Sequence, residues 1–345
     1  MLRLPPFRLL QPTSVDEAVN VLASEGPAAR VVAGGTDLWP NMKRRHQKAE
    51  TVVSLMGLDD LRGVRANGET RIGAITTLTE TAEHAAVRAR YPGLATAIES
   101  ISSPPLRNMG TLGGNVCVDT RCTYYNQSEE WRRSIDYCMK EEGTICWVAP
   151  SSPRCWAHSA SDSAPMLWAL GATLRLLGQA GEREIPVSAL YRDDGIDYLT
   201  KQPAEIVTEI VLPAEAAASG CRSAFWKLRR RGSIDFAVLS VAVALWTEGD
   251  VISQAKIVLG AVGSSPREVS KAQDHLVGRS LADAEAFVTA ADLARKGAVP
   301  MDNTDFQAQW RKAVAGKYVE GALREAAGLP RQRLAPRHEP AGSTD

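Results

Sequence analysis

Cysteine is the residue type in this sequence whose grouping most directly indicates chemistry. Five of the six cysteines lie between Cys117 and Cys155, and only Cys221 is elsewhere. In a reducing compartment, such a group is more often a metal site than a set of disulfides. Thiolates hold both structural zinc ions and iron–sulfur clusters, so the grouping alone leaves the metal open.

Two glycine-rich turns are the second candidate for chemistry. Gly34-Gly35-Thr36-Asp37 follows a short β-branched run, and Thr111-Leu-Gly-Gly-Asn115 repeats the pattern later in the same half of the chain. Consecutive backbone N–H groups in such turns form an anion-binding concavity, and two facing turns suit a pyrophosphate. The alternative is that both are merely tight turns. Neither is a Rossmann fingerprint or a Walker A loop, because the required spacings are missing.

The composition excludes several classes of protein. A chain of 345 residues is long enough for two or three domains. Forty basic residues balance forty acidic ones, so charge gives no reason to expect nucleic acid or an anionic membrane as a partner. No apolar run approaches the roughly 18 residues of a membrane span, and the start lacks a signal peptide's apolar stretch. We expect a cytoplasmic enzyme or enzyme subunit.

Helix and strand patterns alternate in the first half of the chain, which predicts an α+β fold. Ser14-Val-Asp-Glu17 is a possible capping box that opens a helix. Further elements are expected as strands at 30–33, 51–55, 70–75, 172–177 and 205–212, and as helices at 78–88, 91–101 and 164–171.

Residues 116–160 break this pattern and are predicted to be an insertion. They contain the cysteine group and three tryptophans but little periodicity. A long segment of this kind needs something other than a hydrophobic repeat to order it, and a metal site supplies that. A disordered insertion is the alternative, although disordered segments are poor in aromatic residues.

The C-terminal part is predicted to be a smaller domain of antiparallel strands with helices. Segments 225–228, 236–246 and 252–262 are expected to form a meander of antiparallel strands or a strand–helix–strand unit. Helices are expected at 281–296 and 305–327, the last opened by Thr304-Asp-Phe-Gln307. We expect one domain at 1–215, a linker near 213–220, a second domain at 220–328 and a disordered tail at 329–345.

Four motifs in order resemble the FAD-binding medium subunit of the xanthine oxidase family of molybdenum enzymes. They are Val32-Ala-Gly-Gly-Thr36, Gly73-Ala-Ile-Thr-Thr77, Arg107-Asn-Met-Gly-Thr-Leu-Gly-Gly-Asn115 and Ser159-Ala-Ser-Asp162. Phe225-Trp-Lys-Leu-Arg-Arg-Arg231 with Asp235-Phe-Ala237 resembles the start of that family's C-terminal flavoprotein domain. The similarity spans about residues 5 to 325 and implies a two-subdomain, PCMH-type FAD-binding domain followed by the smaller one.

The resemblance implies a set of FAD-binding residues. The pyrophosphate and adjoining sugar atoms would be held by Val32, Ala33, Gly34, Gly35, Thr36, Asp37, Thr111, Gly113, Gly114 and Asn115. Thr76 and Thr77 would add polar contacts, Asp162 would meet the ribose side, and Lys227 would approach the isoalloxazine. No residue of this chain is expected to be catalytic in its own right.

The insertion resembles that of one branch of the family, the β subunits of 4-hydroxybenzoyl-CoA reductases, which carry an additional [4Fe–4S] cluster. The resemblance implies four ligands: Cys122, Cys138, Cys146 and Cys155. Their gaps of 15, 7 and 8 residues are wider than the C-x₂-C to C-x₄-C pairs of zinc ribbons, although a structural Cys₄ zinc site stays open. Cys117 and Cys221 are then expected to be structural.

A chain that holds a flavin and an iron–sulfur cluster would be an electron-transfer subunit. The resemblance implies a large molybdopterin subunit, a small subunit with two [2Fe–2S] clusters, ferredoxin as the electron donor and a dimer of heterotrimers. Reductive dehydroxylation of 4-hydroxybenzoyl-CoA to benzoyl-CoA is the expected reaction. Two alternatives stay open: a subunit of another molybdenum hydroxylase that passes electrons outward, and a non-catalytic scaffold with a zinc-stabilised loop.

Overall fold

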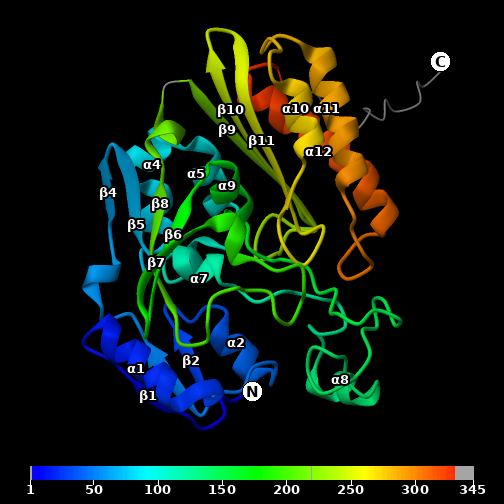
Figure 1. The fold of residues 1–345 in the computed structure, drawn as a ribbon. Helices are drawn as coiled ribbons and strands as arrows, with labels where there is room; N and C mark the ends of the chain where they lie inside the picture. The colour runs from blue at the N-terminus through cyan, green and yellow to red at the C-terminus, as the bar shows by residue number, and fades with distance from the viewer. Residues whose placement is uncertain (1, 219, 331–345) are drawn as a thin grey trace, which may run out of the picture.

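Three β-sheets and the helices between them form the fold in the computed structural model, which describes residues 2–218 and 220–330 (Figure 1). Beyond Pro330, the tail predicted from the sequence lies outside the described residues. No helix in the described ranges is long and apolar enough to cross a membrane.

The N-terminal sheet is parallel and has the strand order β1-β3-β2. Its central strand carries Val52 and Val53, both fully buried, as expected of a parallel strand covered on both faces. The hydroxyl of Ser14 accepts a hydrogen bond from the Glu17 N–H at 3.1 Å and so fixes the start of α1. The elements are β1 (Arg8–Leu10), α1 (Val15–Glu25), β2 (Ala29–Val32), α2 (Leu38–Lys43) and β3 (Thr51–Ser54).

The second sheet is antiparallel, with five strands in the order β4-β5-β8-β6-β7. Leu174 and Leu176 of β6 point into the core while Arg175 between them does not, so one face of the sheet packs against helices and the other is solvated. The strands are β4 (Val64–Asn67), β5 (Glu69–Gly73), β6 (Thr173–Gly178), β7 (Gly181–Pro186) and β8 (Ile206–Leu212). The helices are α3 (Leu78–Glu83), α4 (Ala85–Arg90), α5 (Pro92–Glu99), α6 (Pro104–Arg107), α7 (Leu112–Val116) and α9 (Ser163–Ala169).

The C-terminal sheet is antiparallel, with the order β12-β11-β10-β9, and α11 and α12 cover one of its faces (Figure 1). Residues 239–245 of β10 are all buried, because α5 and α9 of the preceding domain pack against this sheet as well. The elements are β9 (Cys221–Leu228), β10 (Leu239–Glu248), β11 (Val251–Gly260), β12 (Arg267–Glu268), α10 (Ser270–Leu276), α11 (Ala284–Gly297) and α12 (Ala308–Ala326).

The structure confirms the mixed helix and strand architecture and corrects two local predictions. The helix predicted at 78–88 is two helices, because His84 has an extended ψ of 126° between them. The capping box predicted at Thr304 does not form: α12 begins at Ala308, whose N–H donates to Asp302 Oδ1 at 3.0 Å. The predicted domain boundaries stay a prediction.

The cysteine-bearing insertion is a compact irregular segment whose one regular helix, among its described residues, is α8 (Glu129–Ser134). It lies beside α2 and the N-terminal sheet (Figure 1). The side chain of Arg132 is 1% exposed, pairs with Glu129 and Glu141, and donates to the Arg44 carbonyl at 2.7 Å. Buried charge pairing therefore orders a segment that has little hydrophobic periodicity.

Candidate cofactor site and cysteine pocket

The two glycine turns predicted from the sequence meet in the structure. A Cβ on Gly34 would overlap the carbonyl oxygen of Met109, and a Cβ on Gly113 would lie 2.7 Å from the Ala74 carbonyl oxygen. The Gly113 N–H donates to that carbonyl at 2.9 Å. Both positions need glycine because another backbone segment approaches closely there.

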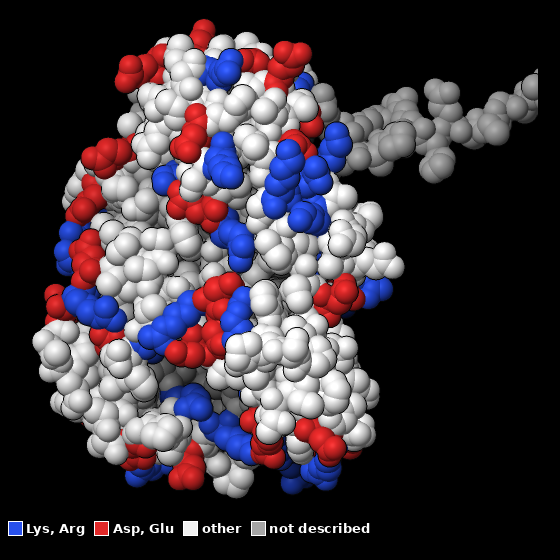
Figure 2. Space-filling model, turned by 45° about the vertical axis from the view of Figure 1, so that its right-hand side comes forward, with Lys and Arg blue, Asp and Glu red and all other residues white. Residues whose placement is uncertain are grey.

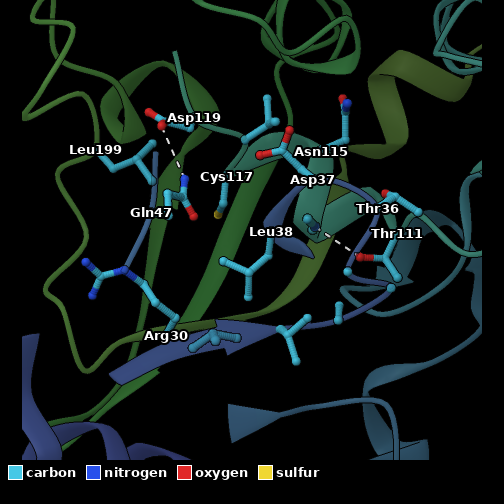
Figure 3. Close-up of a pocket in the computed structure, with 18 of the residues that line it drawn as sticks. Arg30, Thr36, Asp37, Leu38, Gln47, Thr111, Asn115, Cys117, Asp119 and Leu199 are labelled. Carbon is cyan, nitrogen blue, oxygen red and sulfur yellow. Dashed lines mark hydrogen bonds between the residues drawn. The ribbon is translucent and has the colours of Figure 1, made fainter. Parts of the chain in front are cut away.

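A cavity of about 880 Å³ lies between these turns, β2 and the insertion. This volume is in the upper part of the roughly 300–1,000 Å³ range of cofactor and ligand cavities. Figure 3 shows side chains from separate segments of the chain surrounding the same space. On the face drawn in Figure 2, basic and acidic side chains stand around a hollow in the lower half.

Ten of the fourteen predicted FAD-binding residues line this cavity. They are Val32, Ala33, Gly34, Gly35, Thr36, Asp37, Thr111, Gly113, Gly114 and Asn115. They come from the end of β2, the turn before α2 and the start of α7, which the fold brings to one place. The cavity therefore has glycine-rich, backbone-lined walls of the kind that accommodate a phosphate-bearing cofactor.

Thr76 and Thr77 do not line the cavity, and their polar groups are used inside the protein. The Thr76 hydroxyl accepts from the Gly63 N–H at 2.9 Å, and Thr77 caps α3 in a capping box with Glu80. They hold the strand end against which the second glycine turn packs, since the Leu112 N–H donates to the Thr76 carbonyl. Their predicted contact with FAD stays a prediction.

Asp162 and Lys227 form a buried ion pair behind the cavity wall. Their side chains are 4% and 3% exposed, and Lys227 Nζ lies 2.6 Å from Asp162 Oδ2 and 3.1 Å from the Ser100 carbonyl oxygen. Burial raises the pKa of Asp162, and the Lys227 charge opposes that rise. Neither side chain lines the cavity.

Asn115 connects the second glycine turn to the Ser-x-x-Asp motif. Its side-chain oxygen accepts hydrogen bonds from Ser161 Oγ at 3.0 Å and Ser163 Oγ at 2.6 Å. These hydrogen bonds fix the second glycine turn to the residues on either side of Asp162.

Arg121 is a site residue that the sequence reasoning missed. It pairs with Asp37 in the first glycine turn and donates to Asn41 Oδ1 at 3.1 Å, and its guanidinium lies 4.6 Å from the Phe236 ring centroid. Burial nevertheless raises the pKa of Asp37. This ion pair fixes the carboxylate of Asp37 at the cavity wall, and no spacing rule in the sequence marks Arg121 for that role.

The four predicted cysteine ligands line one small buried pocket, together with Tyr125 and Trp147 among others. The four are Cys122, Cys138, Cys146 and Cys155, each at most 8% exposed. The Ala157 N–H donates to Cys155 Sγ at 3.4 Å, and backbone N–H groups two residues further on also donate to Cys122 and Cys138. Such N–H···S bonds favour thiolates and tune iron–sulfur potentials.

Burial raises the pKa of three of these thiols, those of Cys122, Cys138 and Cys155. It raises the pKa of Cys122 to about 12 and that of Cys155 to about 11. Among the described residues, no three histidine, cysteine or acidic side chains are arranged around a single metal ion. The free space in the pocket is about 10 Å³, close to that of one water. A larger group would therefore require the cysteine loops to move apart.

Cys117 and Cys221 lie apart from this pocket. Cys117 borders the large cavity (Figure 3), and Cys221 is in β9. Both are partly buried against the main hydrophobic core. The structural role expected for them stays a prediction.

Comparisons with known proteins match both halves of the chain to domain families. Residues 5–215 match the FAD binding domain in molybdopterin dehydrogenase, and residues 223–326 match the CO dehydrogenase flavoprotein C-terminal domain. The carbon monoxide dehydrogenase medium chain of Hydrogenophaga pseudoflava is 28% identical over 323 residues, covering 93% of this chain and 97% of that one. The aldehyde oxidoreductase FAD-binding subunit PaoB of Escherichia coli is 30% identical over 265 residues, covering 74% and 81%.

The fold agrees with these matches. A solved structure of the Cu,Mo-CO dehydrogenase in its cyanide-inactivated form superposes with a TM-score of 0.77 at 26% identity, covering 94% of this chain and 99% of that one. The glycine turns, the cavity they enclose and the C-terminal sheet are thus parts of one known architecture. This chain belongs to the xanthine oxidase family of molybdenum enzymes, as an FAD-binding medium subunit of an oxidoreductase.

Proposed function

We propose that this chain is the FAD- and [4Fe–4S]-carrying electron-transfer subunit of a molybdenum-dependent 4-hydroxybenzoyl-CoA reductase. The observation that carries the proposal is the convergence of four buried cysteines on one pocket beside the FAD cavity. Its partners would be a large molybdopterin subunit and a small subunit with two [2Fe–2S] clusters, in a cytoplasmic dimer of heterotrimers that takes electrons from reduced ferredoxin.

The spacing of the cysteines in the sequence favours a cluster over a zinc ion. A zinc ion draws four sulfurs to about 2.3 Å from a single point, usually from closely paired cysteines. The gaps of 15, 7 and 8 residues between the four cysteines are wider than those of such pairs. A [4Fe–4S] cluster presents a separate iron to each thiolate and so suits ligands spread around a larger object.

The FAD would occupy the cavity between the glycine turns. Gly34, Gly35, Gly113 and Gly114 line this cavity and present backbone rather than side chains to it. When bound, a flavin exchanges electrons singly or in pairs, whereas an iron–sulfur cluster passes one at a time. A chain that holds both can connect a one-electron donor to a two-electron reaction.

The overall reaction consumes two electrons and two protons for each substrate. The bond between the ring carbon and the phenolic oxygen breaks, the oxygen leaves as water, and a hydrogen takes its place on the ring. This chain would supply the electrons, and the substrate would bind to the molybdopterin subunit.

A cysteine substitution tests the cluster directly. We expect the anaerobically purified chain to contain about four irons and one FAD, with a fast-relaxing EPR signal after reduction by dithionite. Cys138→Ala should lose most of the iron and the EPR signal while FAD remains bound, because Cys138 lines only the cysteine pocket.

Cys221→Ala is the matched control, since Cys221 lies in β9 away from the pocket, and it should keep its iron. Zinc in place of iron in the native chain would refute the proposed cluster. An unchanged iron content in the Cys138→Ala variant would refute it as well.

A second candidate function has support from the named relatives. These include an aldehyde oxidoreductase subunit, carbon monoxide dehydrogenase medium chains and a nicotinate dehydrogenase subunit. This chain would then pass electrons outward from an oxidised substrate. Turnover of the assembled complex with reduced ferredoxin and 4-hydroxybenzoyl-CoA supports the reductase. Activity only with aldehydes or N-heterocycles and an electron acceptor supports the alternative.

A further inference from the structure

One buried lysine lies between the two sites. The Lys140 side chain is 6% exposed and borders both the FAD cavity and the cysteine pocket. Tyr125 also borders both, and the Lys140 ammonium lies 5.1 Å from its ring centroid and 5.5 Å from that of Tyr198. Both distances are within the range of a cation–π contact.

The hydrogen bonds of Lys140 require it to be charged. Its Nζ lies 2.8 Å from Asp119 Oδ1, 2.8 Å from Thr120 Oγ1 and 2.6 Å from the Gly195 carbonyl oxygen. The Thr120 hydroxyl donates its own hydrogen to Gly195, so its oxygen accepts from the lysine. Three acceptors need three hydrogens, which only the ammonium form has.

The two members of the ion pair between Lys140 and Asp119 lie differently with respect to the FAD cavity and the cysteine pocket. Asp119 borders the FAD cavity but not the cysteine pocket, so its negative charge lies on the flavin side only. Glu141, the next acidic residue, is neutralised by its ion pair with Arg132. A group in the cysteine pocket therefore has the Lys140 cation next to it, whereas a group in the FAD cavity borders both members of the pair.

We infer that Lys140 is a positioning residue for electron transfer that makes a cluster in the cysteine pocket easier to reduce. This inference rests on the proposed function. A fixed positive charge stabilises a centre that gains an electron, and it acts strongly where protein excludes water. The charge therefore raises the reduction potential of the cluster more than that of the flavin, and it favours electron entry from a one-electron donor.

Reduction potentials measured on the purified chain test this inference. In Lys140→Met, which keeps the length of the side chain but removes its charge, the midpoint potential of the cluster should fall, and the flavin potential should change less. Lys140→Arg should stay close to the wild type. Lys48→Met removes the same charge at the rim of the FAD cavity, where Lys48 is 76% exposed, and should leave the cluster potential unchanged because water screens it.

An unchanged cluster potential in a Lys140→Met chain that keeps its iron would overturn the inference and leave the proposed function standing. If that variant loses the cluster, Asp119→Asn decides the question. It leaves Lys140 without its counter-charge and should raise both potentials, the flavin's more, while unchanged potentials reject the inference. A wild-type chain without iron is a different result, which refutes the proposed function itself.

Discussion

Gly34→Ala is expected to weaken FAD binding by at least about tenfold, which corresponds to about 1.4 kcal/mol. The new Cβ would overlap the Met109 carbonyl oxygen, a backbone atom that cannot rotate away. The two glycine turns would have to separate, at a typical overpacking cost of about 1–3 kcal/mol. The FAD content of the purified chain and the dissociation constant from flavin fluorescence would measure the effect.

Gly57→Ala is the matched control for this substitution. Gly57 lies in an exposed turn, a Cβ there meets nothing within 4 Å, and its φ is not positive. The FAD affinity of the Gly57→Ala variant should equal that of the wild type. Gly113→Ala changes the other glycine turn and brings a Cβ to 2.7 Å from the Ala74 carbonyl oxygen, so it should also weaken FAD binding. Wild-type FAD affinity in both turn variants would refute the assignment of this cavity.

Lys227→Met is expected to lower the free energy of unfolding by about 3–5 kcal/mol, the usual cost of breaking a buried ion pair. Asp162 would keep a charge that is 4% exposed and has lost its partner. The double variant Lys227→Met/Asp162→Asn should recover most of that loss, because it leaves no unpaired charge. Chemical denaturation of the four proteins in the cycle gives the coupling energy.

The pH dependence of the stability loss in the Lys227→Met variant identifies the cause of that loss. Burial raises the pKa of Asp162, and without Lys227 only the weaker effect of the Arg229 charge opposes that rise. Below a pH of about 4, the carboxyl is protonated in both the folded and the unfolded chain. As the pH rises above this, the unfolded chain loses the proton first, so the stability of Lys227→Met falls relative to the wild type. A penalty that does not vary with pH would mean lost packing instead.

The glycine turns could be located from the sequence because each of them needs glycine for a local reason. Close backbone approach at Gly34 and Gly113 excludes every other residue type, so the requirement is visible as a motif. The cysteines were equally informative, since four thiols from a segment without hydrophobic periodicity have few uses other than metal binding. The four cysteines line one pocket, and their role as metal ligands stays a prediction.

Partnerships between charged residues could not be predicted in this way. Asp162 and Lys227 are 65 residues apart, as are many pairs that never meet. Their ion pair depends on how α5 packs against β9 and how α9 packs against the neighbouring strands β10 and β11. Arg121 and Lys140 look like ordinary surface residues in the sequence, yet both are buried. A charged side chain is buried only where tertiary structure supplies its partner, so no short-range pattern reveals it.

The anchoring of the insertion has a consequence for its evolutionary history. Arg121 forms an ion pair with Asp37, and Arg132 donates a hydrogen bond to the Arg44 carbonyl. The Trp156 carbonyl accepts a hydrogen bond from Asn303 Nδ2 at 2.6 Å. Excising the segment would leave buried polar groups of the parent fold unpaired, at about 1–3 kcal/mol each, whereas replacing its cysteines one at a time would not. Under the proposed function, a descendant that abandons the metal can therefore lose the thiols long before it loses the loop. We then expect the cysteines, rather than the length of this segment, to distinguish related proteins with the proposed cluster from those without it.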